Sequence, residues 1–189
     1  MQSPGDNPIL AFYRGERPDS EGRMISAIRS FSHKVLESTH DYIQWLFPIR
    51  TRSRFNPDAP ILDDATIHAF LTDERLRAEL LTSLRVMLDF YGFRLEAPRG
   101  GPVAVVRSRA WDERRRTWLS PHNHNFLRIT RILACLNTLG LPTYAQAFFA
   151  ALKDVYESEA ANVIGRQTYA FWAAAAAVGG ASSSRGGRG

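Results

Sequence analysis

Cysteine and lysine are the residues that this chain most nearly lacks. Cys135 is the only cysteine among 189 residues, so an intrachain disulfide framework is excluded and a cytoplasmic protein is expected. Lys34 and Lys153 are the only lysines, and arginine therefore carries nearly all of the positive charge behind the net charge of +5. We interpret this excess of arginine as the coding bias of a GC-rich genome rather than as selection for nucleic-acid binding.

Long hydrophobic runs are also missing. The most apolar segment, Tyr169 to Val178, is shorter than the roughly 18 residues that a membrane-spanning helix needs. Residues 1–6 show no basic start followed by an apolar stretch, which a secretory signal would require. The sequence predicts a soluble chain in which Tyr169 to Val178 is a packing helix.

The patterns that mark reactive or metal sites are absent as well. His122 and His124 are two residues apart, so on a helix their side chains would diverge, and no metal site is predicted. Cys135 lies in an apolar helical pattern, where it behaves as a small hydrophobe. Gly100-Gly101 lacks the Lys-Ser/Thr of a phosphate loop. The sequence predicts no catalytic residue, no cofactor and therefore no enzyme.

Helical periodicity dominates what is present. We predict an all-α, single-domain bundle of about seven helices at residues 10–178, between a flexible N-terminus (1–9) and a disordered Gly/Ser/Arg tail (179–189). A long loop rich in Pro and Gly is expected near residues 93–110, with the β-branched run Val103 to Val106 as extended loop. The predicted helices cover about 23–31, 33–47, 63–71, 73–90, 111–119, 120–139, 142–157 and 167–178.

Two segments combine aromatic and polar residues unusually densely. The first, His40 to Pro48, reads HDYIQWLFP, and helical spacing would place His40 beside Gln44 and Asp41 beside Trp45. These side chains either tie the aromatic helix to its neighbours or face a pocket with aromatic walls.

The second segment, His124 to Leu133, reads HNFLRITRIL. Its residues His124, Arg128 and Arg131 share one helix face. Two arginines on one face could bind a carboxylate or phosphate, or they could pair with acidic residues of a neighbouring helix.

Isolated polar groups in apolar stretches are costly to bury, so we predict that the polar residues of the two segments meet and pair. Asp41 is expected beside Arg128 or Arg131. The candidate ligand-binding residues are His40, Asp41, Gln44, Trp45, His124, Asn125, Arg128 and Arg131.

The two segments resemble the signatures of the opioid growth factor receptor conserved-region family. The first looks like the family's HDYIQWLFP run, and the second is similar to HNYLRITRIL, with Phe126 where Tyr is usual. Weaker likenesses extend the resemblance to residues 10–175, at Phe12-Tyr13, Asn56-Pro57 and Met87 to Gly92. The chain resembles a short form without the repeat-bearing tail of the animal receptors.

The resemblance implies a receptor-like binding domain rather than an enzyme. Animal members are receptors for the opioid growth factor, the pentapeptide Met-enkephalin, and associate with membranes, so peripheral membrane association is implied here. Asp41, Trp45 and Arg128 could meet the amino group, an aromatic ring and the carboxylate of such a peptide. The oligomeric state stays open.

The alternative is a basic helical protein that binds nucleic acid or a protein partner. Three arginine clusters could contact phosphates, but no base-reading motif accompanies them, so weak and non-specific nucleic-acid binding is expected. The clusters are Arg50-Arg52-Arg54, Arg107-Arg109 and Arg114-Arg115-Arg116.

Overall fold

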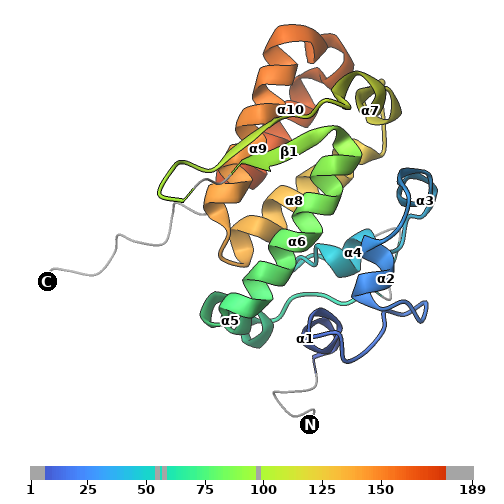
Figure 1. Ribbon diagram of the computed structural model, residues 1–189, viewed down its shortest axis with the longest axis vertical. Helices are drawn as coiled ribbons and strands as arrows, with labels where there is room; N and C mark the ends of the chain where they lie inside the picture. The colour runs from blue at the N-terminus through green and yellow to red at the C-terminus, as the bar shows by residue number, and fades with distance from the viewer. Residues whose placement is uncertain (1–6, 54–55, 57–58, 97–98, 178–189) are drawn as a thin grey trace, which may run out of the picture.

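Short helices form one end of the molecule and long helices form the other (Figure 1). The computed structural model describes residues 7–53, 56, 59–96 and 99–177. Four short helices come first: α1 (Pro8–Tyr13), α2 (Ile25–Arg29), α3 (His33–Ser38) and α4 (Ile43–Leu46). The remaining elements are α5 (Asp64–Thr72), α6 (Glu74–Tyr91), β1 (Phe93–Glu96), β2 (Ala104–Arg107), α7 (Trp111–Trp118), α8 (Asn125–Thr138), α9 (Pro142–Val155), the π-helix η1 (Tyr156–Ala160) and α10 (Ala161–Ala177).

The predicted all-α bundle of about seven helices is wrong. The expected loop at residues 93–110 contains an antiparallel hairpin in which Phe93 of β1 faces Arg107 of β2 and Leu95 faces Val105. The hairpin forms because Phe93 and Val105 bury their side chains, and β-branched residues fit a pleated, half-buried surface. In Figure 1 the hairpin lies across the long helices, and among the described residues there are ten α-helices.

The single helix predicted for residues 33–47 is also wrong. It is broken into α3 and α4, because Thr39 has an extended backbone (φ −101°, ψ 132°) and ends α3. His40 and Asp41 lie in the connector, outside any helix. The i, i+4 neighbours expected from His40 and Asp41 therefore do not form.

Helix α8 begins five residues later than predicted. Ser120 and Pro121 belong to a turn, within which His122 has a positive φ of 59°. The side chain of Asn123 accepts a hydrogen bond from the backbone N–H of Asn125 at 2.9 Å and so satisfies one free donor of the helix start.

Helices α5, α6 and α9 agree closely with the sequence pattern, whereas α10 begins at Ala161, six residues before the helix predicted for 167–178. Asp63 caps α5 by accepting from the N–H of Thr66 at 2.7 Å, as a capping Asp should. Gly92 ends α6 in the left-handed conformation, with φ of 86°. An alanine there would also bring its Cβ within 2.9 Å of the Cβ of Arg114. Pro142 begins α9, as predicted.

The core is built around aromatic rings fixed by hydrogen bonds. Trp118 and Trp172 are fully buried, and their indole N–H groups donate to the carbonyls of Tyr91 and Phe126 at 2.9 and 3.0 Å. These bonds satisfy the polar end of each large apolar side chain. Trp45 and Ile129 are buried too.

The body of the domain starts before residue 10. Asn7 caps α1 by accepting from the N–H of Ile9 at 2.9 Å, and Ile9 is fully buried. The flexible segment predicted for residues 1–9 therefore overlaps an ordered helix, while residues 1–6 lie outside the described residues. The predicted C-terminal tail, residues 179–189, also lies outside them.

Candidate functional site

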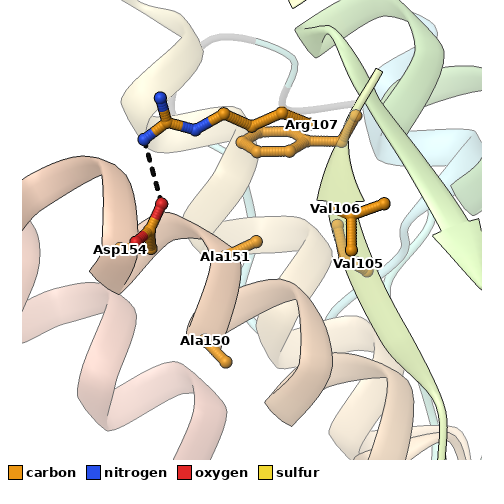
Figure 2. A pocket seen from close by; sticks show the side chains of 7 residues that line it. Val105, Val106, Arg107, Ala150, Ala151 and Asp154 are labelled. Carbon is orange, nitrogen blue, oxygen red and sulfur yellow. Dashed lines mark hydrogen bonds and ion pairs between the residues drawn. The ribbon is translucent and has the colours of Figure 1, made fainter. Parts of the chain in front are cut away.

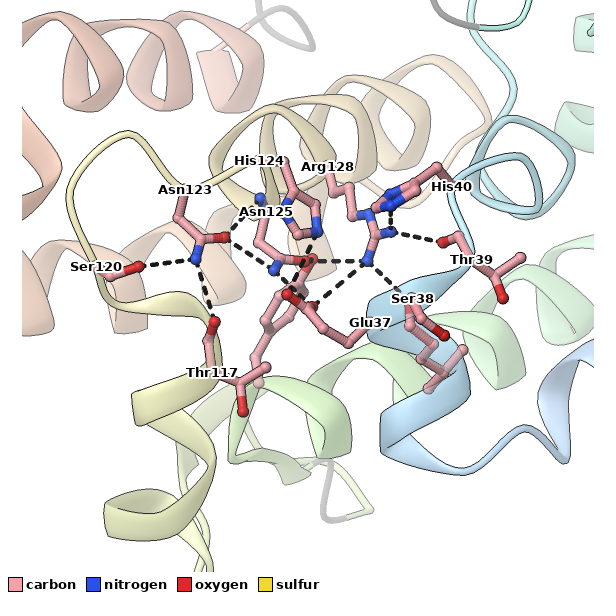
Figure 3. A network of polar contacts seen from close by, with 12 residues as sticks. Glu37, Ser38, Thr39, His40, Thr117, Ser120, Asn123, His124, Asn125 and Arg128 are labelled. Carbon is pink, nitrogen blue, oxygen red and sulfur yellow. Dashed lines mark hydrogen bonds and ion pairs between the residues drawn. The ribbon is translucent and has the colours of Figure 1, made fainter.

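The guanidinium of Arg128 is the centre of a polar network between α8 and the α3–α4 connector (Figure 3). Arg128 is 5% exposed and donates to the carbonyls of Leu36 and Thr39 at 2.9 and 2.7 Å. It also donates to the side-chain oxygen of Asn125 at 3.2 Å, and it lies 5.5 Å from the ring of Tyr42. This burial is tolerated because the cation meets so many acceptors.

The network orients the ring of His40. An Nη of Arg128 lies 3.1 Å from Nδ1 of His40. Arginine has donors and no acceptor, so Nδ1 of His40 must accept and the proton sits on Nε2. In this tautomer the N–H at Nε2 of His40 is available to an acceptor.

Glu37 on α3 also belongs to this network, although the sequence pattern did not single it out. One of its carboxylate oxygens accepts from Nδ2 of Asn125 at 3.0 Å and lies 4.0 Å from an Nη of Arg128. Its other oxygen is 3.5 Å from Nε2 of His124. Glu37 lies three residues before His40 in the sequence, a proximity that could have drawn attention to it.

Two imidazole rings and a carboxylate form the exposed edge of this network. The rings of His40 and His124 meet edge to face, with centroids 5.1 Å apart. The side chains of His124 and Glu37 are 42% and 30% exposed. Burial lowers the pKa of His124, and Arg128 and His40 lower it further, while Glu37 opposes the shift. We call Glu37, His40 and His124 the Glu–His rim.

The structure brings together four of the eight candidate residues: His40, His124, Asn125 and Arg128. Their predicted meeting is confirmed, whereas their ligand-binding role stays a prediction. The predicted pairing of Asp41 with Arg128 or Arg131 is wrong. Asp41 instead forms an ion pair with Arg23 at 2.8 Å, because the broken helix leaves it on the connector.

The other three candidates lie on or against α4. Trp45 packs on Phe12, with ring centroids 5.2 Å apart. Gln44 donates weakly to the hydroxyl of Ser53 at 3.4 Å. Arg131 donates to the carbonyl of Phe47 at 3.3 Å. These side chains are held near the end of α4 rather than in the network around Arg128.

An apolar cavity of about 340 Å³ lies elsewhere, between β2 and α9 (Figure 2). Its apolar lining comes from Phe93 and Val105 on the hairpin and from alanines of α9. An ion pair of 2.9 Å between Arg107 and Asp154 closes one side. The residues that line this cavity are distinct from those of the Glu–His rim.

The described residues offer little for other chemistry. Burial raises the pKa of the Cys135 thiol, so it does not form a reactive thiolate at neutral pH. Burial likewise raises the pKa of Tyr42 to about 12. Throughout the described ranges, no three His, Cys, Asp or Glu side chains gather as metal ligands would. Over the same part of the chain, no helix combines the length and apolar character required to cross a membrane.

Several arginines of the basic clusters already have acidic partners. Arg50 pairs with Asp64 at 2.5 Å. Arg107 and Arg115 both pair with Glu159, at 2.9 and 2.5 Å. Arg54 lies outside the described residues. The charge of these described clusters is therefore partly neutralised within the fold.

Comparison with known proteins gives the affiliation of the chain. The sequence model of the opioid growth factor receptor (OGFr) conserved region matches residues 2–172. The rat opioid growth factor receptor is 39% identical over 146 residues, which are 74% of this chain and 24% of the rat protein. The human receptor is 38% identical over 141 residues, or 72% of this chain and 20% of the human protein. The mouse opioid growth factor receptor-like protein 1 is 34% identical over 139 residues, or 71% of this chain and 29% of that protein.

No solved structure matches the chain. The matching part of the chain spans between a fifth and a quarter of the length of these receptors. The family match nevertheless covers most of its residues, including both aromatic and polar segments and the network that joins them. The chain belongs to the opioid growth factor receptor conserved-region family.

Proposed function

We propose that this chain is a receptor-like binding domain with no enzymatic activity, and that a short peptide binds at the Glu–His rim. The observation that carries the proposal is the carboxylate of Glu37, which is partly exposed and held by Asn125 beside two imidazole rings. The relatives named as opioid growth factor receptors support a receptor-like role.

The rim offers complementary groups for the first residue of a peptide. The carboxylate of Glu37 suits an amino-terminal ammonium, because charge-assisted hydrogen bonds are the stronger kind. The ring faces of His40 and His124 suit an aromatic side chain, and the Nε2–H of His40 suits a carbonyl. Glu37 takes this role in place of Asp41, whose carboxylate is engaged by Arg23.

The buried residues beneath the Glu–His rim support the proposal because they fix the position of the Glu37 carboxylate before a ligand binds. Arg128 is fixed by backbone carbonyls on one side and by Asn125 on the other, and Asn125 in turn holds Glu37. A carboxylate whose position is set before binding loses less freedom when a ligand arrives. A peptide would therefore meet a rim that is already arranged.

Calorimetric titration with Met-enkephalin and its N-acetylated form tests this proposal. We expect acetylation to weaken binding to the parent by about tenfold, because it removes the ammonium that Glu37 contacts. Glu37→Gln should weaken the unmodified peptide by a similar factor and abolish the difference between the two peptides. Glu74→Gln changes an exposed acid in the first turn of α6 and is the matched control. Equal affinities of the parent for both peptides would contradict the proposal.

Nucleic-acid or protein binding through the arginine clusters is the weaker candidate. The ion pairs of Arg50, Arg107 and Arg115 reduce the charge that phosphates would meet. Weak binding without sequence preference, with a shallow dependence on salt, is what such a surface would give. Tight, sequence-selective binding at physiological salt would favour this candidate instead. Peripheral membrane association stays a prediction from the family resemblance.

A further inference from the structure

The outer edge of strand β2 carries backbone groups that β1 does not pair with. Among the described residues the sheet has two strands, so each strand has one open edge. Just beyond the ladder, the N–H of Ser108 donates to the carbonyl of Gly92 at 2.8 Å. Hydrogen-bonded pairs alternate along an antiparallel ladder, so Val105 and Arg107 fall at the positions whose N–H and C=O groups point away from β1. These groups form the open edge of β2.

The apolar cavity between β2 and α9 runs along this edge (Figure 2). Val105 and Val106 both line it, although consecutive side chains of a strand point to opposite faces, so the cavity lies beside the strand and not against one face. Ala150 and Ala151 of α9 form the opposite wall, and their small side chains leave about 340 Å³ open. An open strand edge beside an apolar groove is the arrangement in which an extended peptide adds a strand to a sheet.

One end of the cavity offers a negative charge. An Nη of Arg107 donates to Asp154 at 2.9 Å and to Ser158 at 3.1 Å, and its other Nη pairs with Glu159 at 2.9 Å. The guanidinium is therefore satisfied within the fold. Asp154 accepts through Oδ2, its Oδ1 has no partner among the described residues, and its side chain is 68% exposed. This end of the cavity suits a basic side chain better than an acidic one.

We propose that an extended segment of a partner protein pairs with the open edge of β2 as a third strand. Its small β-branched side chains fill the cavity, and a basic residue lies beside Asp154. A small apolar molecule would fill the cavity but leave the edge groups of Val105 and Arg107 unpaired. A second copy of this chain fits less well, because its own β2 is flanked by β1 and α9, which would have to enter the same space.

The dimensions of the edge set the length and direction of a probe peptide. The four residues Ala104–Arg107 span about 13 Å at the rise of a strand, so five residues cover them. Antiparallel pairing, the more stable kind, places the first residue of the peptide beside Arg107 and Asp154. Acetyl-Lys-Val-Thr-Val-Thr-amide meets these requirements and is the probe.

An NMR titration of the parent with this probe tests the strand pairing itself. The backbone amide signals of Val105 and Arg107 should shift more than the signal of Val106, which already donates to β1. Two further probes carry a methyl group on the backbone nitrogen of the first valine or of the central threonine. One of them should bind about tenfold more weakly, and the other should stay within about threefold of the probe, because alternate residues of a strand donate to its neighbour.

Substitutions in the wall of the cavity test its location. Ala150→Met fills the cavity from an exposed position on α9 and should weaken binding of the probe about tenfold. Ala170→Met makes the same change at an exposed alanine of α10 and should leave the affinity unchanged. Asp154→Asn should remove the preference for the probe over a peptide with glutamine in place of its lysine, whereas Glu157→Gln, at a 61% exposed side chain, should keep it.

Several outcomes would overturn the proposal. One is a probe that does not bind at about 1 mM, and another is binding that Ala150→Met leaves unchanged. Equal affinities of the two methylated probes would show that the cavity accepts apolar groups without strand pairing. Sedimentation of the parent alone tests the remaining occupant: a dimer that Ala150→Met dissolves would assign the edge to a second copy of the chain.

Discussion

The two aromatic and polar segments have similar compositions but very different structures. Residues 124–133 form the start of α8, a regular helix of 14 residues. Residues 40–48 form a connector and the four-residue helix α4. So short a helix is not stable by itself, because the first turn costs more conformational entropy than it returns in hydrogen bonds.

The difference shows which segment positions the other. The backbone of the first segment is held by side chains from elsewhere: Arg128 binds the carbonyl of Thr39, Arg131 binds that of Phe47, and the hydroxyl of Tyr13 donates to the carbonyl of Leu46. Helix α8 makes its own backbone hydrogen bonds. The first segment is therefore shaped by its partners, and α8 serves as the template.

The largest expected effect comes from removing the Trp45 side chain, which packs the first segment, residues 40–48, into the core. Trp45→Ala should lower the free energy of unfolding by about 3–5 kcal/mol, because a buried indole leaves a cavity that α4 cannot fill. Chemical denaturation measures the change. Phe171→Ala removes a ring that is 54% exposed and should cost less than about 1 kcal/mol. A Trp45→Ala transition that superimposes on that of the parent would show that the segment lies outside the cooperative core.

The second prediction tests whether α8 holds the first segment in place rather than the reverse. Arg128→Met should destabilise the fold by about 2–4 kcal/mol, because the carbonyl of Thr39 loses its donor and that of Leu36 keeps only the hydroxyl of Tyr42. Hydrogen exchange should then rise in residues 36–47 before it rises in α8. Arg131→Met removes a single weaker bond and should cost about 1 kcal/mol. Equal loss of protection in both segments would contradict the template role of α8.

The same contrast explains how much of the fold could be predicted from the sequence. Long periodic helices carry their own signals, so α6 with its final Gly92 and α9 with its initial Pro142 were predicted closely. The break at Thr39 has no such local signal, because it depends on bonds that Arg128 makes from 89 residues away. The hairpin was missed because its short strands gain stability from burying Phe93 and Val105 against other elements.

The candidate site, like the fold, was predicted only in part from the sequence. His40, His124, Asn125 and Arg128 were found because their polar character stands out in apolar stretches. Glu37 was missed because it precedes the first segment and its role depends on the turn at the end of α3. Asp41 was placed wrongly because its predicted partners assumed an unbroken helix.

The smallest effect concerns the ionisation of His124, where the two segments meet. Burial makes the neutral ring the favoured form in the folded state, and the charge of Arg128 and the ring of His40 act in the same direction, against Glu37. The pKa of His124 is thus lower in the folded state than its ordinary value of about 6.5 in the unfolded chain.

Below that ordinary value the unfolded chain binds the proton more readily than the folded chain does. The stability contributed by His124 is therefore complete above pH about 6.5 and is lost as the pH falls toward the lower pKa of the folded state. We expect the melting temperature of the parent to fall more between pH 7.5 and pH 5 than that of His124→Gln. His68→Gln, which removes an exposed imidazole on α5, is the control. If the melting temperatures of the parent and of His124→Gln fall in parallel over this range, protonation of the His124 ring does not contribute to the pH dependence of stability. Because the His124 side chain is 42% exposed, solvent screens its charge and the difference should be modest.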